Sequence, residues 1–112
     1  MKYAVGIDVG GTNTRVALIN DEYKIVERVQ FSTDTQNPQV TLEKINNVIK
    51  GFGQKIEGIG ISCPGPLDLI HGIILETPNL PGWHYFHLTE ELQNITGIKV
   101  QLQNDANLAG LA

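Results

Sequence analysis

A short stretch near the N-terminus, GIDVGGTNTR, holds residue types that bind phosphate. Asp8 is followed closely by Gly10, Gly11 and Thr12. Glycine amides let an anion approach the backbone without side-chain interference, and we expect a positive φ at Gly11 in the turn. An ordinary glycine hairpin with a solvated aspartate explains the same residues, because short motifs also match by chance. Taken alone, the stretch leaves both interpretations open.

A second polar pair, Asn104 and Asp105, follows the last strand-like segment of the chain. Asparagine and aspartate are favoured at the N-terminus of a helix, and a helix cap would explain Asp105 without any chemistry. A carboxylate at the carboxyl end of a strand also lies where open α/β sheets bind ligands. One residue can serve both purposes, so the two interpretations are compatible.

Two loops rich in proline and glycine carry further candidates. Gly65 lies in the turn Pro64-Gly65-Pro66, and Asn79 lies in the rigid loop TPNLPGW. By default the first is a turn after a buried strand and the second a loop asparagine that bonds its own backbone. Trp83 and Cys63 are predicted to be packed inside. Three histidines lack metal-ligand spacing and receive no role: His71, His84 and His87.

The elements that position these residues follow from the spacing of apolar side chains. Period-two alternation predicts three strands that form an antiparallel meander, over residues 3–9, 14–19 and 24–31. A helix is predicted from Pro38, which suits a first helical turn, until Gly51 and Gly53 stop it.

The second half of the chain alternates strands and helices. A strand over 56–62 has almost no side chains on one face, and a short hairpin turns around His71-Gly72. A helix is expected to start with Thr89 as its N-cap and to end at Gly97. A last strand is predicted over 98–102 and a final helix from Asn104. The predicted order of elements along the chain is therefore β-β-β-α-β, a hairpin, then α-β-α. This order implies an α/β fold with a mixed sheet, three antiparallel strands first and helices on the faces, which resembles the ribonuclease H-like domain of actin- and hexokinase-type ATPases.

The composition narrows the class of protein. The 112 residues are 41% hydrophobic and 18% charged, which suits one globular domain. The net charge of −4 argues against a protein that mainly neutralises nucleic-acid phosphates. A single cysteine makes neither an internal disulfide nor a zinc cage. With no signal peptide and no apolar run long enough to span a membrane, we expect a cytoplasmic protein without a membrane partner.

Four stretches, in this order and at this spacing, resemble the ROK family of bacterial sugar kinases, which includes glucokinases. The resemblance spans nearly the whole chain and rests on GIDVGGTNTRVALI, GIGISCPGPLD, TPNLPGW and VQLQNDANLAGLA. It implies ATP-dependent phosphorylation of a hexose or hexose derivative, with ATP, Mg²⁺ and a small-molecule sugar as partners.

The resemblance also implies roles for single residues. The turn of Gly10, Gly11 and Thr12 would contact the phosphates of ATP, with Asp8 near the Mg²⁺. Four residues would bind the sugar, namely Asn79, Asn104, Asp105 and Gly65. Asp105 would also be the general base.

The family has a second lobe that would hold adenosine, further sugar contacts and a structural zinc site. We therefore expect residues 1–112 to be the N-terminal lobe of a two-lobe kinase, inactive in isolation and homodimeric when intact, with no zinc site in this chain. Two alternatives stay open: a metal-dependent nuclease on the same fold, which would use Asp8 and Asp105, and a non-catalytic sugar-binding domain. The contacts that choose the sugar would lie outside these residues.

Overall fold

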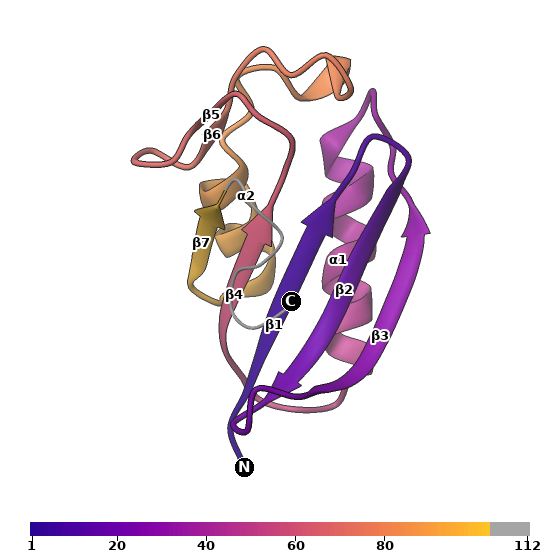
Figure 1. Cartoon of the computed structure of the whole chain (residues 1–112), viewed down its shortest axis with the longest axis vertical. Coiled ribbons are helices and arrows are strands. Elements are labelled where there is room, and N and C mark those ends of the chain that lie inside the picture. Colours follow the sequence, from indigo (N-terminus) through magenta and orange to yellow (C-terminus); the bar gives the residue numbers. More distant parts are fainter. Residues whose placement is uncertain (104–112) are drawn as a thin grey trace.

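A computed structural model describes residues 1–103 of the chain. Its centre is a five-stranded sheet in the order β3-β2-β1-β4-β7, and a two-stranded ribbon, β5-β6, lies beside one end (Figure 1). The elements in chain order are β1 (Tyr3–Val9), β2 (Asn13–Asn20), β3 (Ile25–Ser32), α1 (Pro38–Gly51), β4 (Ile56–Ser62), β5 (Leu67–Asp68), β6 (Ile73–Ile74), the 3₁₀ turn η1 (Pro81–Trp83), α2 (Leu88–Thr96) and β7 (Val100–Gln103).

The first three strands form the predicted antiparallel meander. β1 pairs with β2 along its whole length, from Tyr3 opposite Asn20 to Val9 opposite Thr14. β2 then pairs with β3. A tight turn joins β1 to β2 and a second one joins β2 to β3, so the three strands need only short connections.

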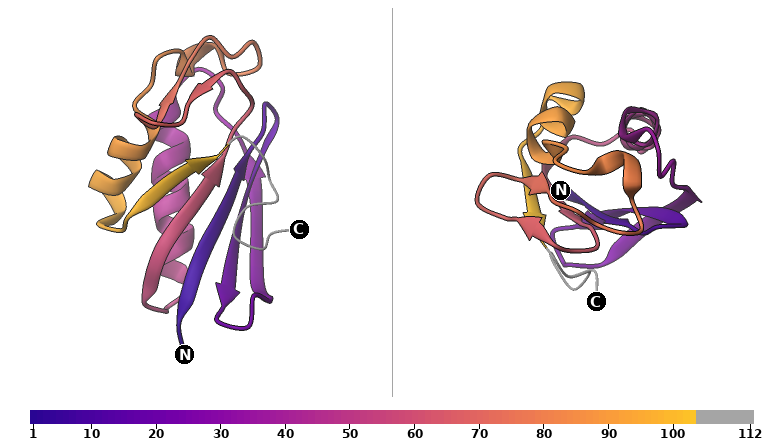
Figure 2. Two further views of the ribbon diagram at one scale, coloured as in Figure 1. Left: turned by 60° about the vertical axis from the view of Figure 1, so that its left-hand side comes forward. Right: turned by 90° about the horizontal axis from the view of Figure 1, so that it is seen from above.

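The later strands add to the sheet in parallel. β4 pairs with β1 and β7 pairs with β4, so the carboxyl ends of β1, β4 and β7 meet at one edge. The helices α1 and α2 both lie on the same face of the sheet (Figures 1 and 2). The sheet is therefore mixed and the fold is the predicted α/β, ribonuclease H-like arrangement of actin- and hexokinase-type proteins.

Alternation along the strands separates a helix-facing core from a nearly bare face. Val5 and Ile7 of β1 are fully buried with the apolar residues of α1 and α2. On the opposite face Gly6 pairs with Gly60 of β4, which confirms the predicted strand face without side chains. No helix in the described part of the chain has the length and apolar character needed to cross a membrane.

One predicted helix start is wrong. Helix α2 begins at Leu88 with His87 at the cap position, not with Thr89 as the cap. The Thr89 amide instead donates to the carbonyl oxygen of Gly72 at 3.2 Å, and Gly72 packs so closely on Thr89 that a side chain there would overlap it. The hairpin thus takes the position that a capping side chain would need. The final predicted helix lies outside the described residues.

Candidate functional site

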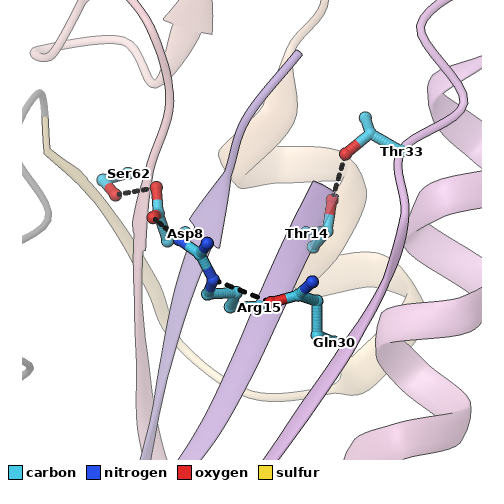
Figure 3. Close-up of polar contacts among 6 residues, drawn as sticks. All are labelled: Asp8, Thr14, Arg15, Gln30, Thr33 and Ser62. Atoms are coloured by element: carbon cyan, nitrogen blue, oxygen red, sulfur yellow. Dashed lines mark hydrogen bonds and ion pairs between the residues drawn. The ribbon is translucent and has the colours of Figure 1, made fainter. Parts of the chain in front are cut away.

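The carboxylate of Asp8 lies near the carboxyl end of the central strand β1, with a partner on each oxygen (Figure 3). The Ser62 hydroxyl on β4 donates to Oδ1 at 3.3 Å. Nη1 of Arg15 on β2 lies 3.6 Å from Oδ2. The Asp8 side chain keeps 33% of its surface exposed. It is therefore fixed in position and still open to a ligand.

Arg15 is held from its other side by the next strand. It stands opposite Asp8 in the β1–β2 register and opposite Gln30 in the β2–β3 register, and its Nε donates to Gln30 Oε1 at 3.0 Å (Figure 3). Its side chain is 55% exposed, and ion pairs at such positions contribute only about 0–1 kcal/mol. Arg15 can thus release Asp8 to a cation at low cost.

The turn between β1 and β2 offers fewer free amides than the sequence suggests. The amide of Gly10 donates to the carbonyl oxygen of Asn13 at 2.8 Å and closes the hairpin. The amides of Gly11 and Thr12 form no hydrogen bond with other described residues. Anion binding at this turn therefore rests on Gly11 and Thr12.

The glycine at position 11 is required for a reason other than the predicted one. Gly11 has no positive φ, so that expectation is wrong. A side-chain carbon on Gly11 would instead lie 2.9 Å from Cβ of Asn79 and 3.3 Å from the Asn79 carbonyl oxygen. Real Cβ atoms do not approach a neighbour at 2.9 Å, so only glycine permits this contact. The structure brings together two candidate residues that lie far apart in the sequence.

The loop that carries Asn79 is tied to the turn that carries Gly65. The buried hydroxyl of Thr77 donates to the carbonyl oxygen of Pro64 at 3.1 Å. Nε2 of His84 lies 2.9 Å from the carbonyl oxygen of Thr77 and must carry the proton, because a carbonyl only accepts. Asn79 and Gly65 are both exposed, and Asn79 makes no side-chain hydrogen bond to another described residue. Its amide is therefore available to a ligand.

Two residues predicted to be packed inside are buried. Trp83 is fully buried and its Nε1 donates to the carbonyl oxygen of Asp34 at 2.8 Å. Cys63 follows β4, and burial, with the negative charge of Asp8 as a second cause, raises the pKa of its thiol far above the ordinary value. Cys63 is therefore a protonated packing residue beside the site.

Two predicted site residues, Asn104 and Asp105, lie outside the described residues. Conversely, sequence reasoning missed Arg15, Ser62 and Gln30 as neighbours of Asp8. A signal for Arg15 was present, because the short hairpin between two predicted strands places it opposite Asp8. Ser62 required the position of β4 beside β1, and Gln30 required the β2–β3 register, neither of which the local pattern gives.

The chain is similar to known proteins over nearly its whole length. The ROK family model matches residues 4–112. A glucokinase from Thermotoga maritima is 38% identical over 106 residues, which covers 92% of this chain and 33% of that protein.

Solved structures of ROK-family proteins also match the chain over most of its length. The ROK hexokinase of Thermus thermophilus superposes with a TM-score of 0.82 at 32% identity, over 94% of this chain and 36% of that one. The ROK glucokinase of Streptomyces griseus, solved with glucose and AMPPNP, has a TM-score of 0.75 at 25% identity, over 94% of this chain and 34% of that one. The present chain therefore spans about a third of the length of the proteins it matches.

Proposed function

Since the chain belongs to the ROK family, we propose that the intact protein is a sugar kinase that transfers a phosphoryl group from ATP to a hydroxyl of a hexose or hexose derivative. The observation that carries the proposal is the contact between Gly11 and Asn79. It joins a turn suited to phosphate with a loop suited to a sugar. Phosphoryl transfer depends mainly on holding these two groups together in the right orientation.

The turn after β1 would hold the phosphates of ATP. The amides of Gly11 and Thr12 have no other acceptor among the described residues, and Gly10 would shape the turn rather than bind. A glycine at position 11 also keeps this surface free of side-chain atoms. These residues would orient the terminal phosphate toward the loop of Asn79.

Asp8 is suited to Mg²⁺. Magnesium usually binds through one or two carboxylates together with substrate phosphates and water, rather than through a cage of protein ligands. In residues 1–103 no three histidine, cysteine, aspartate or glutamate side chains converge, so a single partly exposed carboxylate fits that pattern. When bound, the ion would neutralise negative charge on the phosphates. Ser62 would hold Asp8 in place, and Arg15 would turn away.

The sugar would lie against the loop of Asn79. The Asn79 amide, with Asn104 and the exposed backbone at Gly65, would bond sugar hydroxyls. Asp105 would accept the proton of the attacking hydroxyl, a role that contributes about 10²- to 10⁴-fold to the rate. Orientation has equal weight, because a sugar offers several competing hydroxyls.

We further propose that residues 1–112 form the first lobe of a two-lobe kinase and do not phosphorylate sugar alone. The support is that the chain spans about a third of its relatives' length. The second lobe would bind adenosine and carry any structural zinc. We propose that the intact kinase is a cytoplasmic homodimer.

A coupled assay of ADP formation tests this function in the intact protein. We expect ATP consumption that requires a hexose, with glucose, mannose, fructose and N-acetylglucosamine compared at equal concentration. Cleavage of nucleic acid without sugar-dependent ATP use would favour the nuclease alternative. Sugar binding by calorimetry without any turnover would favour the non-catalytic domain.

A further inference from the structure

We propose that residues 33–37, which we name the bridge loop, couple the nucleotide site to the sugar site, and that Trp83 is the positioning residue that transmits this coupling. The inference rests on the proposed kinase function and deepens it. It predicts that the two substrates bind cooperatively because one rigid segment supports both of their loops.

One end of the bridge loop holds residues 10–12 between β1 and β2, which we name the phosphate turn. The amide of Thr33 donates to the carbonyl oxygen of Thr12 at 2.9 Å. The hydroxyl of Thr33 also lies 2.7 Å from the hydroxyl of Thr14, which is fully buried (Figure 3). Two bonds therefore link the bridge loop to the backbone of the turn at Thr12 and to the start of β2 at Thr14.

The other end of the bridge loop holds residues 77–83, which carry Asn79 and which we name the sugar loop. Nε1 of Trp83 donates to the Asp34 carbonyl oxygen at 2.8 Å, and the amide of Gly82 donates to the Thr35 carbonyl oxygen at 2.8 Å. Gly82 packs so closely on the backbone of Gln36 that any side chain there would overlap it. Because Trp83 is fully buried, this end is a packed joint rather than a surface contact.

The bridge loop is itself braced. The Asp34 carboxylate accepts hydrogen bonds from the amides of Gln36 at 3.0 Å and Asn37 at 2.8 Å. The amide of Asp34 donates to the buried hydroxyl of Thr41 on α1 at 3.0 Å. Two internal bonds and one bond to α1 hold the bridge loop in a single conformation, so we expect a displacement at one end to shift the other end as well.

The contact of Gly11 with Asn79 closes the path into a ring. The path runs from the phosphate turn through the bridge loop and the buried contact at Trp83 to the sugar loop. The contact between Asn79 and Gly11 then leads back to the phosphate turn. Ordering of the turn by nucleotide would therefore order the sugar loop in advance, and the second ligand would bind more tightly. By linkage the sugar must strengthen nucleotide binding by the same factor.

The test is the coupling factor, the ratio of the Kd for sugar without and with AMPPNP, measured by calorimetry on the intact protein. The sugar is glucose, or the hexose that is the better substrate. In the unmodified protein we expect a factor of about 5 or more, within the usual range for coupled sites. Trp83→Phe keeps the aromatic packing and removes the bond to Asp34, and we expect its factor to fall below about 2.

Two further variants keep the result interpretable. Tyr85→Phe is the matched control, since it removes the bond from an exposed aromatic hydroxyl to Glu76 in the same loop, and its factor should equal that of the unmodified protein. Thr33→Val cuts the bond to Thr14 at the other end of the bridge loop, and it replaces Trp83→Phe if that variant does not fold. A merely structural role would weaken each affinity and leave their ratio unchanged.

The outcomes separate the two proposals. An unchanged factor in Trp83→Phe, or in Thr33→Val if the first does not fold, would overturn the coupling and leave the kinase assignment standing. A factor of 1 in the unmodified protein, with both ligands bound, would do the same. An unmodified protein that binds neither ligand would overturn the kinase function and the coupling with it.

Discussion

The α-carbon of Gly11 lies so close to Asn79 that an added side-chain carbon would be 2.9 Å from Cβ of Asn79. Gly11 belongs to the turn after β1 and Asn79 to the loop before η1, so the contact depends on the whole fold. It places a phosphate-binding candidate directly beside a sugar-binding candidate.

Gly11→Ala should reduce kcat/KM for the sugar by about tenfold or more. The added methyl group would push the Asn79 loop away, and overpacking of this kind costs about 1–3 kcal/mol. Steady-state kinetics on the intact protein measure the effect. Gly51→Ala is the matched control, because an added carbon there meets nothing within 4 Å and should leave kcat/KM unchanged. Equal kinetics for both variants would contradict the importance of the contact.

Asp8→Asn should lower turnover at least about 100-fold and raise the Mg²⁺ concentration needed for half-maximal rate. The asparagine amide has the size of the carboxylate but lacks the negative charge that would hold the cation. A bound metal ion stabilises the transition state of such a reaction by several kcal/mol. Titration of the rate with Mg²⁺ shows both effects. Asp21→Asn, a change at an exposed turn residue, should behave as the unmodified protein. A wild-type Mg²⁺ dependence in Asp8→Asn would remove Asp8 from the metal site.

Asp105→Asn should lower kcat by about 10²- to 10⁴-fold while the protein stays folded. Asparagine caps a helix as well as aspartate does, but it cannot accept a proton. The measurement pairs kcat in a coupled assay with the unfolding temperature. Turnover within a few-fold of the unmodified protein would exclude Asp105 as the general base.

Cys63 should resist alkylation in the folded protein at pH 8 and react at once after unfolding. Its thiol stays protonated because burial, aided by the charge of Asp8, raises its pKa above the ordinary value of 9.0. Iodoacetamide labelling followed by peptide mass spectrometry locates the modified residue. Rapid labelling of Cys63 in the native state would show that the thiol is exposed or ionised.

The same shift sets a pH dependence of stability. Above pH 9.0 the unfolded chain loses the Cys63 proton while the folded chain keeps it, so the free energy of unfolding falls as pH rises. The expected slope is up to about 1.4 kcal/mol per pH unit. Comparison with Cys63→Ala isolates this slope from other titrating groups, and identical slopes would refute it.

Much of the fold is predictable from the sequence because its signals are local. Alternation along residues 3–9 gives β1, and Pro38 with Gly51 brackets α1. Thr89 shows where local reasoning fails. A threonine before two glutamates is a favourable cap, yet the close contact with Gly72 decides the helix start.

The sequence predicts which residue types form the candidate site, but it does not predict how the fold places them relative to one another. The glycine at position 11 was expected for its backbone freedom, whereas its real constraint is Asn79, far along the chain. The short predicted hairpin places Arg15 opposite Asp8, but the bond that holds Arg15 to Gln30 depends on the β2–β3 register. Such relationships arise from tertiary contacts, which periodicity and turn chemistry do not encode.

The most direct test of the central claim is a crystal structure of the intact protein with a hexose and AMPPNP bound together. We expect the terminal phosphates to lie within hydrogen-bond distance of the Gly11 and Thr12 amides, about 2.7–3.2 Å. We also expect a sugar hydroxyl to form a hydrogen bond with the side-chain amide of Asn79, the residue that Gly11 contacts. Phosphates bound away from this turn, or a sugar that does not contact Asn79, would contradict the claim.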